Sequence, residues 1–393
     1  MAEYFPRTGK PVMKRYCEPY IIQDISKKMV FIGGPRQVGK TTLSQALCQE
    51  EYHNCEYFNW DVDEDRRAIT KKQWKQDSPL IIFDELHKYP RWKQWIKGVY
   101  DSKPDDQQYI VTGSARLDVY RRGGDSLMGR YHYWRLHPLT IDELPEGMTM
   151  TEGYERLLRL GGFPEPFLSN DEREVRRWRR ERFDRILRED IRDLEQIQDI
   201  QLLYLFIDEL RQRAGNLITL SNLAGDLQIA PRTAKNWLAL AERMYICFPI
   251  YPLTKNIPRS IQKPPKVYFY DNGDTVDDPG IRLENLVATT LLKRLHFLED
   301  YHGHKCTLHY IRDKDSREVD FVTVIDDKVT DLIEVKSSDT NISNSLKYYT
   351  EKLRPQRAVQ LVGNLNRSFD KNGIRVTSPI EFFADPPWIN PHE

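Results

Sequence analysis

A glycine-bearing segment near the N-terminus has the residue types and spacing of a phosphate cradle. It reads Gly-Pro-Arg-Gln-Val-Gly-Lys-Thr from position 34 and fits the pattern G-x-x-x-x-G-K-[ST]. The apolar run 29–32 precedes it and an apolar-periodic stretch follows from Leu43, so the motif stands between an expected strand and an expected helix. Backbone N–H groups in such a loop can surround phosphate oxygens. The predicted nucleotide contacts are Gly34, Pro35, Arg36, Gln37, Val38, Gly39, Lys40, Thr41 and Thr42.

Two adjacent carboxylates follow a second apolar run, at 80–83. Asp84 can hold the shell of a Mg²⁺ ion, and Glu85 can polarise a water molecule for in-line attack on the γ-phosphate. Lys40 can reach the β- and γ-phosphates, while the Thr41 hydroxyl can supply a further Mg²⁺ ligand. The sequence therefore predicts ATP and Mg²⁺ as cofactors and favours hydrolysis over binding alone.

Further candidates for the same chemistry lie downstream. The expected strand 108–112 ends in Thr112, and Ser114 follows two residues later; either hydroxyl can contact the γ-phosphate or the attacking water. Arg130 can neutralise charge in the transition state, supplied by a neighbouring subunit as an arginine finger, although a surface arginine explains it almost as well. A finger that works in trans implies a head-to-tail homo-oligomer, for which a ring is the closed form.

A second group of charged residues lies in the C-terminal third. Glu284 falls on an expected helix, 282–297, and Asp320 falls in an expected strand, 318–325. Glu334 and Lys336 end the next strand in the spacing D-x13-E-x-K, and residues two apart in a strand face the same side. The three carboxylates are predicted to bind Mg²⁺, and the lysine to orient or deprotonate a water that attacks a phosphodiester. The alternative is a relic that binds metal or DNA without cutting.

The middle of the chain contains two short helical segments joined by a turn. Residues 221–227 and the segment from Pro231 have the layout of a helix-turn-helix, with Arg232 and Lys235 early on the second helix. Arginine and lysine at such positions can contact duplex or branched DNA. The alternative is a winged-helix fold that is used for protein packing.

The elements that position these residues predict an α/β protein of three parts. Strands alternate with helices in 1–150, which is typical of a parallel sheet. The second part, 151–252, has helical apolar spacing from Tyr154 to about Arg243, and strands and helices alternate again in 253–393. Four prolines fall within 252–265, where neither a helix nor a central strand can continue, and this places the second boundary.

Composition excludes several classes of protein. The 393 residues carry 59 Lys+Arg against 59 Asp+Glu, so a strongly basic chain is excluded and DNA binding requires a local patch. The longest apolar runs are about six residues against the ~18 that cross a bilayer, and the N-terminus has no secretory signal. We therefore expect a cytoplasmic protein without a membrane partner. Five scattered cysteines are expected to be reduced thiols.

Several of these motifs resemble those of prokaryotic AAA-type ATPases. The matching segments are 34–43, 83–90, 112–115 and 128–131, while 160–165 and 280–285 are similar to the domain of unknown function that follows in that family and has a nuclease-like fold. The acidic motif of the C-terminal third resembles the PD-(D/E)XK nuclease superfamily, although Val319 precedes Asp320 where the superfamily's name has proline. The resemblance implies an AAA-type P-loop domain, a winged-helix part and a nuclease-like domain.

Two functions are consistent with this sequence. The first is an ATP-hydrolysing, DNA-binding protein with a Mg²⁺-dependent nuclease-like domain, acting in DNA repair, recombination or defence. The second is an ATP-dependent switch or scaffold whose nuclease-like domain binds without cutting.

Overall fold

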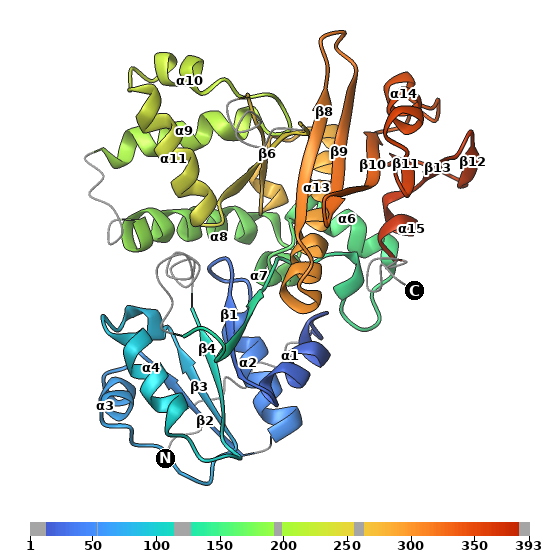
Figure 1. The fold of residues 1–393 in the computed structure, drawn as a ribbon. Helices are drawn as coiled ribbons and strands as arrows, with labels where there is room; N and C mark the ends of the chain where they lie inside the picture. The colour runs from blue at the N-terminus through green and yellow to red at the C-terminus, as the bar shows by residue number, and fades with distance from the viewer. Residues whose placement is uncertain (1–12, 53, 114–126, 192–198, 255–262, 385–393) are drawn as a thin grey trace.

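The computed structural model describes residues 13–52, 54–113, 127–191, 199–254 and 263–384 (Figure 1). It confirms the predicted α/β class, with a parallel sheet at the N-terminus, helices in the middle and a mixed sheet at the C-terminus. One predicted site residue, Ser114, lies outside the described residues.

The N-terminal sheet has five parallel strands in the order β2-β3-β4-β1-β5. The strands are β1 (Met29–Gly33), β2 (Cys55–Asn59), β3 (Leu80–Asp84), β4 (Gln108–Thr112) and β5 (Tyr131–Arg135). Parallel strands bring their carboxyl ends to one edge, so the loop after β1 meets Asp84 and Glu85 at the end of β3 there. Strand β5 was not among the strands expected from the sequence.

Helices cover both faces of this sheet. Val30 and Ile32 pack into one core with α1 (Glu18–Ile25) and α2 (Lys40–Leu47). Met29 and Phe31 point to the opposite face and pack into a second core, because successive strand residues alternate in direction. That core contains the apolar faces of α3 (Asp63–Lys71) and α4 (Trp92–Asp101). Burial on both faces explains the continuous apolar runs of these strands.

The middle of the chain is helical. Asp171 and Asp199 each accept a hydrogen bond from backbone N–H groups in the first turn of the helix that follows them, which fixes where those two helices begin. Pro231 starts another helix, at a position where its missing N–H costs nothing. The helices are α6 (Met150–Leu160), α7 (Pro164–Ser169), α8 (Glu172–Arg185), α9 (Ile200–Gln212), α10 (Leu220–Asp226) and α11 (Pro231–Arg243).

The C-terminal sheet is mixed and has eight strands in the order β12-β13-β11-β10-β9-β8-β6-β7. Antiparallel pairing joins β8 to β9 and β9 to β10, whereas β10 and β11 are parallel. The strands are β6 (Cys247–Pro252), β7 (Lys266–Phe269), β8 (Cys306–Arg312), β9 (Glu318–Ile325), β10 (Lys328–Lys336), β11 (Arg357–Val362), β12 (Phe369–Lys371) and β13 (Ile374–Thr377), with helices α13 (Pro279–Phe297), α14 (Asn344–Leu353) and α15 (Pro379–Ala384).

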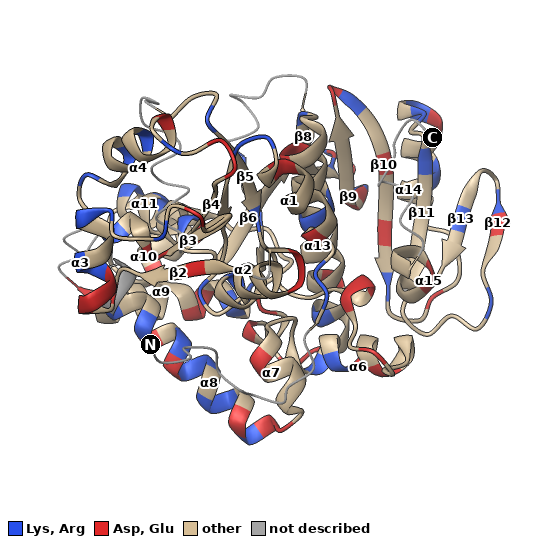
Figure 2. Cartoon of the chain, turned by 90° about the horizontal axis from the view of Figure 1, so that it is seen from below, with Lys and Arg blue, Asp and Glu red and all other residues tan. Residues whose placement is uncertain are grey.

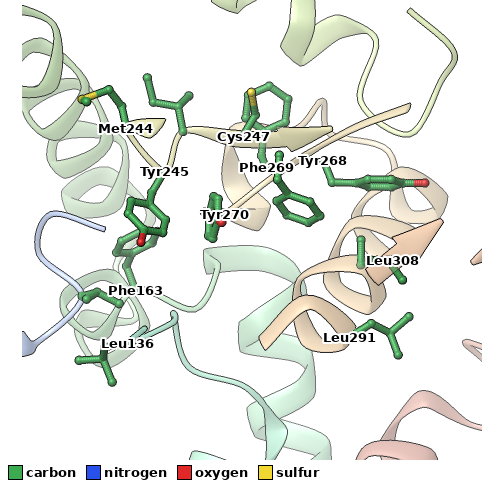
Figure 3. Packing of buried hydrophobic residues seen from close by; sticks show 14 of the residues in the cluster. Leu136, Phe163, Met244, Tyr245, Cys247, Tyr268, Phe269, Tyr270, Leu291 and Leu308 are labelled. Carbon is green, nitrogen blue, oxygen red and sulfur yellow. The ribbon is translucent and has the colours of Figure 1, made fainter. Parts of the chain in front are cut away.

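One hydrophobic core runs through all three parts. Figure 3 shows Leu136 beside Phe163 and, farther along the same cluster, Tyr268 and Leu291. Strand β6 lies before the predicted boundary at 252 and pairs with β8 beyond it, so the boundary crosses a continuous sheet. The domain limits therefore stay a prediction.

The prediction of reduced thiols was wrong for two of the five cysteines. Cys48 and Cys55 form a disulfide: Cys48 starts the short π-helix η1 (Cys48–Tyr52) that continues α2, and Cys55 starts β2. Cys17, Cys247 and Cys306 are buried thiols. Within the described ranges, no helix combines the length and the apolar character needed to cross a membrane.

Candidate functional site

The predicted phosphate loop spans the gap between β1 and α2. Gly34 and Gly39 have φ angles of 141° and 99°, which favour glycine. A Cβ added at Gly34 would lie 2.3 Å from the carbonyl oxygen of Leu136, so only glycine fits this close approach. The loop is therefore shaped by its two glycines and leads directly into the first turn of α2.

The side chain of Lys40 folds back onto the start of this loop. Its Nζ donates hydrogen bonds to the carbonyl oxygens of Gly34 (3.1 Å) and Pro35 (2.7 Å), and the residue is buried. A buried ammonium group within the loop supplies the positive charge that phosphate oxygens require. Lys40 therefore lies where the sequence predicts it.

Asp84 is the centre of a hydrogen-bonded cluster at the end of β3. Its Oδ2 accepts from Thr41 Oγ1 (2.7 Å) and from the Tyr57 hydroxyl (2.6 Å), and its Oδ1 accepts from the Thr112 hydroxyl. The structure thus brings together three predicted residues from three separate elements. The hydroxyl of Thr41 and the carboxylate of Asp84 are hard oxygen donors, and this donor set fits Mg²⁺.

Tyr57 is a member of this cluster that sequence reasoning missed. It lies in β2. Burial and, to a smaller extent, the negative charge of Asp84 raise the pKa of its phenol. In the sequence, nothing distinguishes Tyr57 from the other aromatic residues expected in strands. Only the register of β2 beside β3 places its hydroxyl on Asp84.

Glu85 lies next to Asp84 in the left-handed region, with a φ of 55°. Its side chain is 24% exposed, and its Oε2 is 3.4 Å from Lys88 Nζ and 3.6 Å from His87 Nε2. Burial raises the pKa of this carboxyl, whereas the charges of Lys88 and Lys40 act in the opposite direction. A raised carboxyl pKa favours a general base near neutral pH.

Arg130 does not join this cluster. It precedes β5, and Tyr131 pairs with Met29 at the start of β1, whereas the phosphate loop begins five residues later, at Gly34, about 16 Å along the strand. Arg130 instead makes a bidentate pair with Asp101, with Nε–Oδ1 at 2.7 Å and Nη2–Oδ2 at 3.1 Å. It lies at the sheet edge opposite its own phosphate loop, so a role as arginine finger requires a second chain.

The C-terminal sheet gathers the second predicted group. Lys336 Nζ is 2.7 Å from Glu334 Oε1, and Asp320 Oδ2 accepts from the backbone N–H of Val335 (2.9 Å). Burial and the charge of Asp320 raise the pKa of both Glu284 and Glu334 to about 7. The second oxygen of Glu334, Oε2, is buried and has no hydrogen-bond partner among the described residues. The four predicted residues therefore share one charged cluster.

Lys266 completes this cluster and was not predicted as part of it. Its Nζ lies 2.7 Å from Glu318 Oε1 and within 3.6 Å of oxygens of Glu284 and Asp320. Burial alone would lower the pKa of Lys266, but these carboxylates raise it. In the sequence Lys266 only begins a strand after two prolines.

Across the described ranges, no group of three or more His, Cys, Asp and Glu side chains has the arrangement of a metal site. Lysine is the cation that these acids hold in this structure.

The helix-turn-helix segment consists of α10 and α11. Arg232, Lys235 and Asn236 are exposed on α11, while Trp237 and Leu238 on the other side of the helix are buried. The polar face is therefore accessible to a partner.

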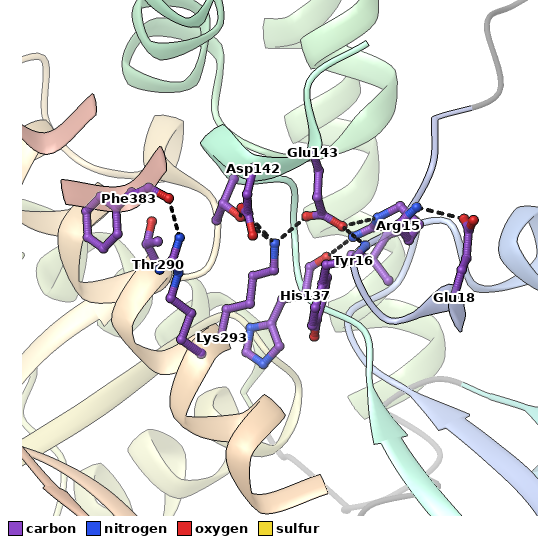
Figure 4. Close-up of polar contacts among 12 residues, drawn as sticks. Arg15, Tyr16, Glu18, His137, Asp142, Glu143, Thr290, Lys293 and Phe383 are labelled. Atoms are coloured by element: carbon purple, nitrogen blue, oxygen red, sulfur yellow. Dashed lines mark hydrogen bonds and ion pairs between the residues drawn. The ribbon is translucent and has the colours of Figure 1, made fainter. Parts of the chain in front are cut away.

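A buried ionic network joins the phosphate loop to α13 (Figure 4). Arg15 donates to the carbonyl oxygen of Val38 in the loop (3.0 Å) and to Glu143 Oε1 (2.8 Å). Glu143 Oε2 in turn accepts from Lys293 of α13, whose N-terminal half carries Glu284. The network thus connects the phosphate loop to the helix that carries part of the acidic cluster.

Family models match three consecutive parts of the chain. Residues 26–145 match an AAA domain, residues 151–274 a domain of unknown function (DUF8612) and residues 279–382 another domain of unknown function (DUF4143). This agrees with the resemblance seen in the phosphate-loop motifs. The chain carries an AAA-type P-loop ATPase domain followed by further domains of unknown function, and the nuclease-like resemblance stays a prediction.

Similar proteins have been found in bacteria and archaea. An uncharacterized protein of Mycobacterium tuberculosis is 26% identical over 246 residues, which are 62% of this chain and 54% of the relative. An uncharacterized protein of Methanocaldococcus jannaschii is 24% identical over 371 residues, which are 85% of this chain and 80% of the relative. The match therefore spans about half the length of the mycobacterial relative.

Two solved structures align with parts of the chain. The Holliday junction branch migration motor RuvB of Thermotoga maritima covers 60% of this chain and 87% of its own, with 17% identity and a TM-score of 0.29. The Pif1 helicase from Bacteroides covers 36% of this chain and 48% of its own, with 15% identity and a TM-score of 0.19. At TM-scores this low, neither structure defines the domain arrangement or the activity of this chain.

Proposed function

We propose that this chain hydrolyses ATP at its P-loop and uses the cycle to act on DNA. The observation that carries the proposal is the hydrogen-bonded cluster in which Asp84 accepts from Thr41 and Thr112 beside the buried Lys40. These residues come from three elements that meet at one sheet edge, where phosphate, metal and water would have to meet.

Each residue has a distinct role in this proposal. Lys40 and the loop N–H groups bind the phosphates, and Thr41 with Asp84 would hold Mg²⁺, which supplies neutralisation of phosphate charge when bound. Glu85 takes a proton from the attacking water, and Thr112 orients Asp84 through its hydroxyl. Arg130 acts on the nucleotide of a neighbouring chain in a homo-oligomer.

DNA contact is assigned to the exposed face of α11. Arg232 and Lys235 lie on that face, and a basic side chain of this kind binds phosphate groups of a duplex or branched DNA through charge. Because the chain as a whole is neutral, binding depends on these local charges and falls steeply with salt.

The C-terminal cluster has two possible roles in the proposed function. The buried oxygen Oε2 of Glu334, which has no hydrogen-bond partner among the described residues, supports a first role in which Glu284, Asp320 and Glu334 would hold Mg²⁺. Lys336 would then place the water that attacks a phosphodiester of DNA. The position of Lys266 favours the second role, a switch or scaffold in which the cluster binds without cutting. We propose cleavage as the primary role, within a C-terminal domain at 253–393 that follows domains at 1–150 and 151–252.

The testing experiment incubates duplex, single-stranded and branched DNA with the full chain and Mg²⁺ or Mn²⁺, with and without ATP. We expect cleavage by the wild type, and none by Asp320→Ala or Glu334→Ala, while all three hydrolyse ATP. The matched control is Asp327→Ala, an exposed carboxylate of the same domain outside the cluster, which should cut like the wild type. A wild-type protein that hydrolyses ATP but cuts none of these DNAs with either metal contradicts cleavage and leaves the switch.

A further inference from the structure

A cavity of about 300 Å³ lies between α8, α9 and the segment 273–276 that leads toward α13. Three guanidinium groups, those of Arg179, Arg180 and Arg211, line it together with one carboxylate, Asp274. Basic and acidic residues alternate along α8 in Figure 2, but at the cavity the basic residues predominate. An arginine-rich concave surface of this kind attracts anions.

The guanidinium of Arg211, which lines the cavity, is only partly paired within the protein. Its two terminal nitrogens bind Asp208 (2.7 Å) and Asp274 (3.1 Å), while its Nε is buried and has no hydrogen-bond partner among the described residues. Arg180 is exposed, and no ion pair joins it to another described residue. The cavity is therefore lined by one guanidinium, that of Arg180, which no carboxylate of the described residues satisfies.

A fourth arginine, Arg182, is buried beside the cavity-lining Asp274 and adds positive charge. Arg182 is 3% exposed, its nearest carboxylate oxygen is Asp274 Oδ2 at 3.7 Å, and its Nε and Nη2 have no hydrogen-bond partner among the described residues. Burial is the main cause of the lowered pKa of this guanidinium; Asp274 and Asp271 act against it, and Arg211 and Arg179 add to it. Arg179, Arg182 and Arg211 thus share two carboxylates, Asp271 and Asp274, and an anion bound in the cavity would offset the remaining positive charge.

The position of Arg179 is fixed by the protein itself. Its Nε donates to Asp271 Oδ2 (3.0 Å) and its Nη2 to the carbonyl oxygen of Leu160 (2.9 Å). The guanidinium also packs on the bare backbone of Gly273, where an added Cβ would lie 1.6 Å from Nη2. A group held in this way loses little entropy when a ligand binds.

We propose that this cavity binds a phosphate group, and that it is separate from the P-loop. The planar guanidinium fork matches phosphate oxygens, and a volume at the lower end of the ~300–1,000 Å³ range of ligand sites suits a phosphate or diphosphate group. Asp274 also faces the cavity, but its charge is shared by Arg211 and Arg182. The phosphate belongs to a nucleotide, to the backbone of DNA, or to the free ion.

The test measures pyrophosphate binding by calorimetry in the full chain carrying Lys40→Ala, so that the P-loop contributes little. Adding Arg180→Gln is expected to weaken binding about tenfold, since it removes one charge-assisted contact without disturbing the core. The matched control is Arg177→Gln, which makes the same change on the same helix outside the cavity. Arg211→Gln should weaken binding at least as much as Arg180→Gln.

Competition then identifies the source of the phosphate. Displacement of pyrophosphate by ATP assigns the cavity to nucleotides, displacement by a short DNA duplex assigns it to the DNA backbone, and displacement by neither assigns it to free phosphate. Equal affinities in the Arg180→Gln and Arg177→Gln proteins, or no pyrophosphate binding at all, would overturn the proposal. The binding measurement does not require ATP hydrolysis, because it is made in the Lys40→Ala background. A failure of the proposed ATPase function would therefore leave the outcome for this cavity unchanged.

Discussion

Replacing Lys293 with methionine is expected to destabilise the chain and to weaken nucleotide binding. The Lys293 side chain is 1% exposed, and its Nζ lies 3.3 Å from Asp142 Oδ1 and binds Glu143, whose side chain is fully buried. Methionine fills a similar volume but removes the charge, so the change takes the paired lysine away from Asp142 and leaves Glu143 with Arg15 as its cation. Glu143 also positions Arg15 on the phosphate loop, so the effect extends to the nucleotide site.

The magnitude follows from the burial of the pair. Removing one partner of a buried ion pair costs ~3–5 kcal/mol. Because Glu143 also pairs with Arg15, at 2.8 Å, and this pair is untouched by the substitution, we expect a loss at the lower end, about 3 kcal/mol. The matched control is Lys305→Met, whose pair with Asp327 at 2.8 Å is exposed on both sides and is worth at most about 1 kcal/mol.

Asp142 adds a pH dependence to this prediction. Burial alone would raise the pKa of its carboxyl, but Lys293 is the largest of the groups that lower it, to about 2. A lowered native pKa contributes stability that is fully present above the unfolded value of ~4 and is lost as the pH falls toward 2. The Lys293→Met protein should therefore lose less stability over that acid range than the wild type.

The assay is urea unfolding followed by circular dichroism at pH 7 and at points between pH 4 and 2, together with ATP affinity at pH 7. We expect a lower urea midpoint and weaker ATP binding for Lys293→Met, and values close to the wild type for Lys305→Met. Equal midpoints for the two variants would refute the reasoning that the buried network carries the stability.

Three other changes have outcomes that the structure predicts. Arg130→Ala should lower ATP turnover and leave ATP affinity unchanged, and a monomer with full turnover at every protein concentration in sedimentation would exclude the trans arrangement. Lys266→Met should raise the affinity for Mn²⁺ measured by calorimetry, because the lysine occupies the space between the acids; an unchanged affinity contradicts this. Arg232→Gln should reduce the slope of log affinity against log salt for duplex DNA by about one, and an unchanged slope would remove this residue from the DNA interface.

The sequence was most informative where one motif determines both the local fold and the chemistry. The glycine loop, its flanking strand and helix, and the acids after β3 follow from spacing alone, because a P-loop requires that order. The α/β class and most strands followed from apolar runs. The two helices of the helix-turn-helix segment also lie close to where the sequence places them.

Other features depend on contacts between distant segments, which a single sequence does not record. Tyr57 reaches Asp84 only through strand register, and Lys266 reaches Asp320 only because β7 folds beside the elements that carry the acids. Strand β5 has half-buried polar positions and no continuous apolar run, so it was not expected. The disulfide between Cys48 and Cys55 likewise depends on how α2 leads into β2.

The most direct test of the central claim is phosphate release from ATP under steady-state conditions, measured beside ATP binding. The account predicts turnover by the wild type, neither tight binding nor turnover by Lys40→Ala, and binding without turnover by Glu85→Gln. Full turnover by Glu85→Gln would contradict the role of Glu85, and turnover by Lys40→Ala equal to that of the wild type would contradict the P-loop as the site of hydrolysis.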